Sequence, residues 1–304
     1  MKTWFENNRR LIFRGAGTGL AIVLLIVLLY QNGWGEIQKA LQRISLLHLV
    51  LALVCILMSR LLISLRWFVL LRSADIKISF KNTISLVFTG LFANNFLPTT
   101  VGGDVVRLAG AIQLGFDEAI CLASIAADRV VNMVGMSLAS PLGIWQLLTI
   151  PAAGGISQGL VGAGLLKKGW DFLKKTMGSF KLWFQKPTAL ILALGFAIAH
   201  MTFSFSANYI LINGLGGSLP LWKVLGLFSL AYFVSLVPIS INGYGVQELT
   251  VTYLLSHFGG ISLPISATVA VLHRLLMVFV SLPGALTLPG IMALMDKKQD
   301  SNSI

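Results

Sequence analysis

The sequence predicts an all-α integral membrane protein with about six transmembrane helices and two re-entrant helical hairpins arranged as an inverted repeat. Of its 304 residues, 56% are hydrophobic and only 11% are charged, whereas soluble domains carry about 25% charged residues. Apolar stretches near or above the roughly 20 residues that one bilayer crossing needs follow one another along the chain. Residues 1–304 are therefore predicted to form a single polytopic membrane domain, with no soluble catalytic domain. The apolar stretches are 12–31, 46–70, 80–97, 119–166, 188–213, 222–238 and 264–294.

The first two stretches are predicted to be the first two crossings. Stretch 12–31 has four basic residues at its start, Lys2, Arg9, Arg10 and Arg14, and no small-residue cleavage site, which favours an uncleaved anchor over a signal peptide. Stretch 46–70 carries Arg60 and Arg66, whose spacing of six places them on different helix faces. We expect Arg66 to extend its charged end toward the inner membrane surface. Arg60 lies deeper, and the sequence leaves open whether it joins a polar interior.

Two segments, 80–116 in the first half (10–150) and 222–258 in the second half (188–294), are broken at matching places. In each, a Pro removes a backbone donor, and a Gly five residues later permits conformations that other residues avoid. The 12 or 13 residues after each break span about 18–20 Å as helix, too short for a crossing of ~30 Å. Each segment is therefore predicted to be a re-entrant hairpin. The residue pairs are Pro98 with Gly103 and Pro238 with Gly243.

The distribution of charge predicts the orientation, because short cytoplasmic loops are rich in Lys and Arg. We assume that both hairpins return to their own side and that 119–166 crosses twice, with a turn near 140–146. Fifteen Lys and Arg residues then lie inside and three outside. This arrangement places both chain termini on the cytoplasmic side of the cell membrane. The three outside are Lys39, Arg43 and Lys223.

Residues 167–186 contain six lysines and one apolar helical face. We interpret this segment as a cytoplasmic amphipathic helix on the inner leaflet, attracted to anionic headgroups. A topology-setting basic loop without lipid selectivity is the alternative. Because most of the net charge of +12 is explained by topology, nucleic acid is not expected as a partner. The apolar face consists of Trp170, Leu173, Met177, Phe180 and Phe184.

A set of polar, Gly and Pro residues gathers around the two breaks and the helix that follows the first of them. Its members are Asn95, Pro98, Gly102, Gly103, Asp104, Arg107, Asp128, Arg129, Pro238, Gly243, Gly245 and Glu248. This set resembles the flippase-like transmembrane domain found in lysylphosphatidylglycerol synthases and in many stand-alone membrane proteins. The resemblance covers about residues 10–292.

The resemblance implies translocation of a lipid, such as an aminoacylated phospholipid or a polyprenyl-linked sugar. In the synthases a cytoplasmic aminoacyl-transferase domain is attached, whereas this sequence ends at Ile304 without one. We therefore expect a transporter whose partners are membrane lipids, rather than an enzyme. A separate lipid-modifying enzyme is a further expected partner.

The first-half candidate site consists of ionisable residues at membrane depth, which cost ~2.5 kcal/mol or more each and usually face a partner or a wet cavity. Arg107 and Arg129 are expected to contact a lipid phosphate, with Asp104 and Asp128 holding them in place. The backbone N–H groups after Gly102–Gly103 offer a positive helix end suited to phosphate. Because neighbours on a helix point about 100° apart, Asp128 and Arg129 are expected to pair with Asp104 and Arg107. A purely structural ion-pair lattice is the alternative.

The second-half candidate site lies on the second hairpin and the last crossing. Glu248 is expected to pair with Arg274, which follows the second hairpin as Arg129 follows the first. His273 is either a proton-sensitive neighbour of this pair or a satisfied structural histidine.

Other function classes remain open to different degrees. The second hypothesis is a proton-coupled carrier of a small anionic solute that uses the same hairpins. A membrane-embedded enzyme acting on lipid phosphates is less favoured, because the four histidines show no metal-ligand spacing, so no metal or cofactor is expected. Cys55 and Cys121 lie in apolar runs, where cysteine behaves as a small hydrophobe. An inert scaffold is ranked below the carrier, since charged hairpins are costly in a bilayer.

Overall fold

The computed structural model describes residues 34–95, 97, 102–149, 185–236 and 240–287, together with Val23 and Trp183. Throughout these residues the secondary structure is helical, without a strand, as the sequence predicts. The elements are α2 (Trp34–Arg43), α3 (Leu46–Ser73), α4 (Phe80–Asn94), α5 (Gly102–Gln113), α6 (Glu118–Thr149), α10 (Pro187–Gly214), α11 (Leu221–Ser235), η3 (Ile241–Gly243), α12 (Val246–His257), α13 (Leu263–Ser281) and η4 (Leu282–Leu286).

Among the described residues, four stretches of helix are long and apolar enough to cross a membrane: α3, α6, α10 and α13 continued by η4. They coincide with four of the six predicted crossings. The other two, 12–31 and 145–166, lie largely outside the described residues, as does the segment 167–186. Pro98 and Pro238 lie outside them entirely.

The outer faces of these long helices carry large apolar side chains. Leu138 on α6, Ile191 on α10 and Phe279 on α13 are 61%, 69% and 57% exposed. Such exposure on several helices is unfavourable in water, and it suits contact with lipid chains. The chain is therefore an integral, multi-pass membrane protein.

The turn predicted near residues 140–146 is wrong, because α6 continues without interruption from Glu118 to Thr149. The prediction came from the count of basic residues on each side of the membrane. Pro141 lies in this stretch; it lacks an N–H and so deprives the carbonyl of Ser137 of its usual helical donor. In the structure the Ser140 hydroxyl donates to that carbonyl at 2.9 Å. A serine side chain thus replaces the missing backbone donor, and the helix tolerates the proline.

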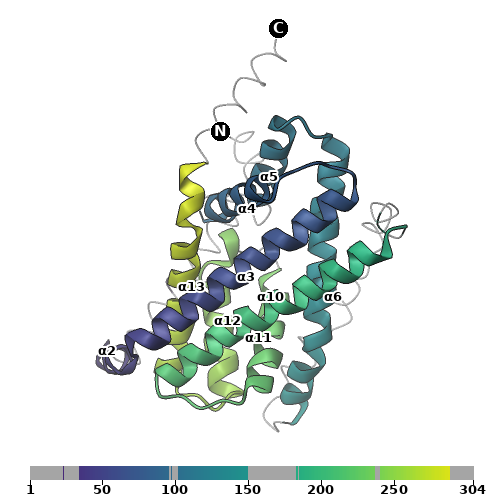
Figure 1. Ribbon diagram of the computed structural model, residues 1–304. Coiled ribbons are helices and arrows are strands. Elements are labelled where there is room, and N and C mark those ends of the chain that lie inside the picture. The colour runs from purple at the N-terminus through teal and green to yellow at the C-terminus, as the bar shows by residue number, and fades with distance from the viewer. Residues whose placement is uncertain are drawn as a thin grey trace, which may run out of the picture.

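The described helices repeat one order twice. A 28-residue helix, a 15-residue helix, a 12-residue helix and a long helix follow one another as α3, α4, α5 and α6, and again as α10, α11, α12 and α13. We call α4 with α5 the first helix pair and α11 with α12 the second helix pair. At about 1.5 Å per residue the arms span roughly 18–22 Å, less than a bilayer core. Figure 1 shows the first pair in the upper part of the molecule and the second pair in the lower part, with α3 and α10 side by side.

The first helix pair packs with its backbones in close approach. An ideal Cβ on Gly90 of α4 would lie 2.6 Å from the carbonyl oxygen of Gly103 on α5. Gly103 has no positive φ; here glycine provides space rather than an unusual turn conformation. The Asn94 side chain at the end of α4 also accepts a hydrogen bond from the Gly103 N–H at 2.6 Å.

We expect Gly90→Ala to destabilise the protein by about 1–3 kcal/mol, because the added methyl meets backbone that does not yield easily. Gly195→Ala on α10 is the matched control, since nothing lies within 4 Å of its added Cβ. Removing a helical glycine there should stabilise by up to about 1 kcal/mol. The measurement is unfolding by SDS titration in mixed micelles. Equal midpoints for the two variants would contradict the close approach of α4 and α5.

The second break uses glycine in the way that the sequence predicts. Asn242, Gly243 and Gly245 have φ values of 48°, 73° and 77°, in the left-handed region that glycine, and to a lesser degree asparagine, adopts readily. The backbone therefore adopts these conformations without strain from a Cβ at either glycine.

The two breaks meet in space. The Tyr244 hydroxyl from the second break donates to Asn95 Oδ1 at the first break, at 3.2 Å. Asn95 in turn donates through Nδ2 to Ser281 Oγ on α13 at 2.9 Å. Segments about 150 residues apart in sequence thus enclose one region between the two helix pairs.

Candidate functional site

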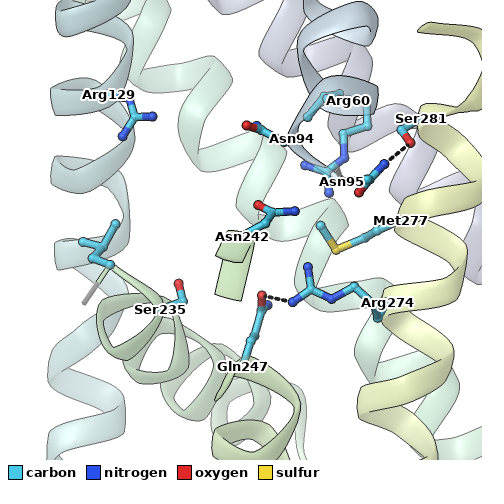
Figure 2. A pocket seen from close by; sticks show the side chains of 12 residues that line it. Arg60, Asn94, Asn95, Arg129, Ser235, Asn242, Gln247, Arg274, Met277 and Ser281 are labelled. Atoms are coloured by element: carbon cyan, nitrogen blue, oxygen red, sulfur yellow. Dashed lines mark hydrogen bonds between the residues drawn. The ribbon is translucent and has the colours of Figure 1, made fainter. Parts of the chain in front are cut away.

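A cavity of about 230 Å³ lies where the two breaks meet, and we call it the arginine cavity. Figure 2 shows Asn94 and Asn95 of the first break, Asn242 of the second break and residues of α3, α6 and α13 around it. The described residues that line it are Arg60, Leu91, Asn94, Asn95, Arg129, Ser235, Leu236, Asn242, Gln247, Arg274, Met277 and Ser281.

Three arginines, Arg60, Arg129 and Arg274, line the arginine cavity from three different helices. Its described lining contains no Asp or Glu. The other polar lining groups are amides and hydroxyls, which also donate hydrogen bonds. Guanidinium groups arranged around a cavity are suited to bidentate binding of phosphate or carboxylate.

Arg60 differs from the other two arginines because it has no counter-ion within the described part of the chain. It lies at the middle of α3 and is only 9% exposed. No carboxylate of a described residue approaches its guanidinium within 4.0 Å. A buried charge without compensation is costly, so the position favours an anion supplied from outside the chain. The sequence did not decide whether Arg60 joins a polar interior, and the structure places it there.

Arg129 reaches the arginine cavity from α6. Its Nε donates to Asp104 Oδ2, and its side chain is 37% exposed. The carboxylate of Asp104 therefore fixes the guanidinium while part of it stays accessible. This geometry agrees with the predicted role of Asp104 as a holder of Arg129.

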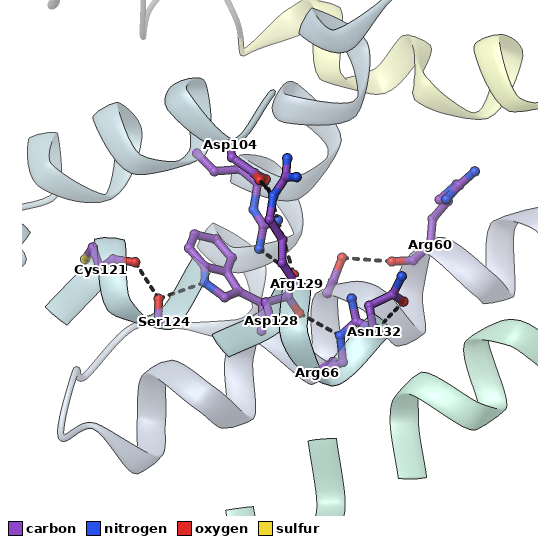
Figure 3. A network of polar contacts seen from close by, with 11 residues as sticks. Arg60, Arg66, Asp104, Cys121, Ser124, Asp128, Arg129 and Asn132 are labelled. Atoms are coloured by element: carbon purple, nitrogen blue, oxygen red, sulfur yellow. Dashed lines mark hydrogen bonds and ion pairs between the residues drawn. The ribbon is translucent and has the colours of Figure 1, made fainter. Parts of the chain in front are cut away.

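A buried ion-pair lattice adjoins the arginine cavity through Asp104, the partner of Arg129 (Figure 3). Asp128 on α6 accepts from Arg66 Nε at 2.6 Å and from Arg107 Nη2 at 3.3 Å. Arg107 also donates to Asp104 at 3.1 Å, and its guanidinium lies 4.1 Å from the ring centroid of Trp67. Three helices, α3, α5 and α6, are tied together by these contacts.

Arg66 does not extend toward the membrane surface, as the sequence analysis expected. It is 3% exposed and donates to both Asp128 and Asn132, the latter at 2.8 Å. Asn132 continues the lattice to the second helix pair by donating to the Tyr232 hydroxyl at 3.1 Å. Pairing with a carboxylate inside the bundle satisfies Arg66 without any need to reach water.

Arg107 and Arg129, which were expected to contact the same phosphate, lie in different surroundings in the structure. Arg129 lines the arginine cavity, whereas Arg107 lies in the lattice, between Trp67 and two aspartates. The N–H of Gly103, expected to be exposed to a phosphate, is instead donated to Asn94. A neighbouring amide oxygen satisfies this first-turn donor, as a capping side chain does.

The second half contains the predicted Glu248–Arg274 pair. Arg274 Nε donates to Glu248 Oε1, and Arg274 Nη2 donates to Gln247 Oε1 at 2.8 Å. The guanidinium also lies 4.7 Å from the ring centroid of Tyr244. His273, beside this pair in sequence, is 8% exposed.

The two halves use equivalent positions for their acid–arginine pairs. Asp104 is the third residue of the 12-residue helix α5, and Glu248 is the third residue of the 12-residue helix α12. Each accepts from the Nε of an arginine 25 or 26 residues later in the chain, on the following long helix. The sequence pattern of an arginine after each break therefore corresponds to a repeated contact.

Several lining residues were not singled out from the sequence, namely Asn94, Ser235, Asn242, Gln247 and Ser281. Asn94 and Asn242 could have been found as amides inside the two breaks, next to residues that were chosen. The others are ordinary polar residues of helices, and only the fold brings them together. Among the described residues no three His, Cys, Asp or Glu side chains are placed to hold a metal ion.

The family of the chain follows from a comparison with protein-family models. The model of the lysylphosphatidylglycerol synthase transmembrane region matches residues 15–167 and 163–284. The chain belongs to this family. The match covers every element of the arginine cavity and of the lattice, from α3 to α13.

Proteins named "UPF0104 membrane protein" are similar to this chain. A "UPF0104 membrane protein" of Methanothermobacter thermautotrophicus is 32% identical over 147 residues, 47% of this chain and 40% of that protein. One of Pyrococcus horikoshii is 27% identical over 136 residues, 44% of this chain and 41% of the relative. The chain thus matches about two fifths of the length of each. A second Methanothermobacter protein of that name is 20% identical over 303 residues, 84% of this chain and 89% of the relative.

Proposed function

We propose that the protein is a flippase that moves a phosphate-containing lipid across the cytoplasmic membrane. The arginine cavity carries this proposal. It offers three guanidinium groups and several amide and hydroxyl groups to a headgroup, and its described lining has no carboxylate. Lipid chains would remain in the bilayer while the headgroup enters the cavity, so that only the polar part needs a polar path.

The repeated order of helices supports a transport role. Transporters commonly bind their substrates near the bilayer midplane, where discontinuous helices of inverted repeats meet. We propose that the two helix pairs are re-entrant hairpins, the first entering from the cytoplasm and the second from outside. With two further crossings, at 12–31 and after the end of α6 within 150–166, the protein has six crossings and cytoplasmic termini. The meeting of the breaks at Asn95 and Tyr244 fits this arrangement.

A proton-coupled carrier of a small anionic solute is the second candidate. The volume of about 230 Å³ favours it, because a free anion such as phosphate fits there without lipid chains. An aminoacylated or polyprenyl-linked lipid, supplied by a separate lipid-modifying enzyme, remains within the leading proposal.

The test is reconstitution into liposomes with labelled anionic, aminoacylated and polyprenyl-phosphate lipids. Wild type is expected to move at least one phosphate-containing class, seen as loss of label protection. Arg129→Ala should lower that rate by about tenfold or more, because charge-assisted hydrogen bonds contribute roughly 1.5–3 kcal/mol each. Arg43→Ala, an exposed arginine at the end of α2, is the matched control and should behave as wild type.

Two outcomes would redirect the proposal. Uptake of a soluble anion with no movement of any lipid would favour the carrier. Lipid movement that is equal in wild type and in Arg129→Ala would overturn the placement of the site at the arginine cavity.

A further inference from the structure

A second, much smaller cavity lies beside the arginine cavity, with a volume of about 10 Å³. Three buried polar atoms that have no hydrogen-bond partner among the described residues belong to its lining: Asn208 Oδ1, Glu248 Oε2 and His273 Nδ1. A fourth, Thr252 Oγ1, lies one helical turn beyond Glu248 on α12. All four side chains belong to residues that are at most 8% exposed. Unpaired buried polar atoms are uncommon in folded proteins, and a group of them indicates a ligand.

The chemistry of these atoms indicates water and a proton rather than a metal cation. Asn208 uses its Nδ2 to donate to Ser204 O at 3.0 Å, which leaves its oxygen as an acceptor. A cavity needs roughly 10–15 Å³ to hold one water molecule, so this one has no room for a hydrated ion. A water molecule can donate to Asn208 and Glu248 and accept from His273. A metal cation would also be repelled by the adjacent guanidinium of Arg274.

The two cavities share a wall. Gln247 and Arg274 line both of them, and Arg274 is the counter-ion of Glu248. The Nη1 group of Arg274 has no partner among the described residues, and Figure 2 shows the guanidinium directed into the arginine cavity. A single arginine thus lines the anion site on one side and pairs with the Glu248 carboxylate on the other.

We propose that Glu248 is a proton-binding site whose protonation is coupled, through Arg274, to occupancy of the arginine cavity by an anion. An anion bound at Arg274 uses part of the positive charge that compensates Glu248. Because like charges disfavour ionisation, anion binding promotes protonation of Glu248. By reciprocity, a protonated Glu248 leaves Arg274 free to bind the anion more tightly. This inference rests on the proposed anion-binding role of the arginine cavity.

Charged and titratable groups near Glu248 come from several elements. α13 contributes Arg274 and His273, and the turn before α12 contributes Tyr244. Arg60 on α3 lines the arginine cavity together with Arg274 and interacts with it electrostatically. In the lining of the small cavity, α10 contributes Asn208 and α11 contributes Phe228, neither of which titrates. Glu248 is the acidic residue in that described lining, so the proton is assigned to it.

The experiment is calorimetric titration of the full-length protein in a neutral detergent. The probe is dihexanoyl phosphatidylglycerol, whose phosphodiester does not titrate near neutral pH. Titrations in buffers of different ionisation enthalpy count the protons taken up. Wild type should take up as much as about one proton per bound anion, and its affinity should fall as pH rises, by up to about tenfold per pH unit. The same titrations with choline in place of sodium should give the same affinity.

Glu248→Gln mimics the protonated state. It should bind the probe at every pH with an affinity near that of wild type at low pH, and without proton uptake. Glu118→Gln, the same exchange at an exposed position at the start of α6, is the matched control and should keep the proton uptake of wild type. The wild-type proton count tests the coupling even if Glu248→Gln does not fold.

The possible outcomes separate the two proposals. Binding by wild type without proton uptake overturns the coupling and leaves the anion site standing. Proton uptake that persists in Glu248→Gln overturns the assignment to Glu248. If the probe binds only in the presence of sodium, the coupled ligand is a metal cation, and the proposal of a proton at Glu248 is wrong. Absence of any binding overturns the anion site and this inference together.

Discussion

Asp128→Asn is expected to destabilise the protein by about 3–5 kcal/mol, the cost of removing one partner from a buried ion pair. Asp128 is 3% exposed and compensates both Arg66 and Arg107. In the variant, the nearest remaining carboxylate, Asp104, is shared by Arg107 and Arg129. Arg66 then has no carboxylate partner among the described residues. The measurement is SDS-titration unfolding in mixed micelles, with the yield of folded protein as a second readout.

The matched control for this change is Asp75→Asn. Asp75 also forms an ion pair, with Lys186 at 3.0 Å, but its side chain is 89% exposed. Exposed pairs contribute about 0–1 kcal/mol. The φ of Asp75 is 64°, a conformation that asparagine adopts readily, so the exchange adds no backbone strain. If Asp128→Asn were as mild as Asp75→Asn, the lattice would not be a stabilising feature of the fold.

The order of the helices could be predicted from the sequence, because the information is local. Twenty apolar residues, a Pro and a Gly five residues later are visible in a short window, and both breaks lie where these signals place them. The turn expected near 140–146 was wrong because it was assumed from the charge count alone. That Pro141 stays inside a helix depends on the hydroxyl of Ser140, a detail of rotamer and hydrogen bonding. A proline in an apolar helix therefore predicts a break only where no neighbouring side chain replaces the lost donor.

The contacts of the site could be predicted only in part. The Glu248–Arg274 pair could be expected because each half offers an acid after its break and an arginine on the next helix. The partner of Arg66 could not, since Asp128 lies 62 residues away and is brought near by packing of α3 against α6. The same packing decides that Arg60 faces a cavity rather than a carboxylate. A charged residue at membrane depth can be recognised in the sequence as a candidate site residue. Whether it already has an ion-pair partner depends on how the helices pack.

Arg60→Gln is expected to reduce lipid translocation by about ten- to one-hundred-fold while leaving the protein as stable as wild type or more stable. Arg60 has no counter-ion within the described part of the chain, so its removal relieves a buried charge instead of breaking a pair. The lost contact with the substrate anion, roughly 1.5–3 kcal/mol, corresponds to this loss of rate if the headgroup binds Arg60 during transfer. Stability lost to improve function is a common compromise at functional sites.

Arg72→Gln is the control on the same helix. Arg72 is exposed near the end of α3, with its guanidinium 5.9 Å from the ring centroid of Phe68, and it does not line the arginine cavity. It should move lipid at the wild-type rate. The decisive comparison measures both translocation and stability in each of the two variants. Arg60→Gln should lose translocation without losing stability, whereas Asp128→Asn should lose stability first. A loss of stability in Arg60→Gln equal to that of Asp128→Asn would mean that Arg60 belongs to the structural lattice, and that its position at the cavity wall is not a sign of substrate binding.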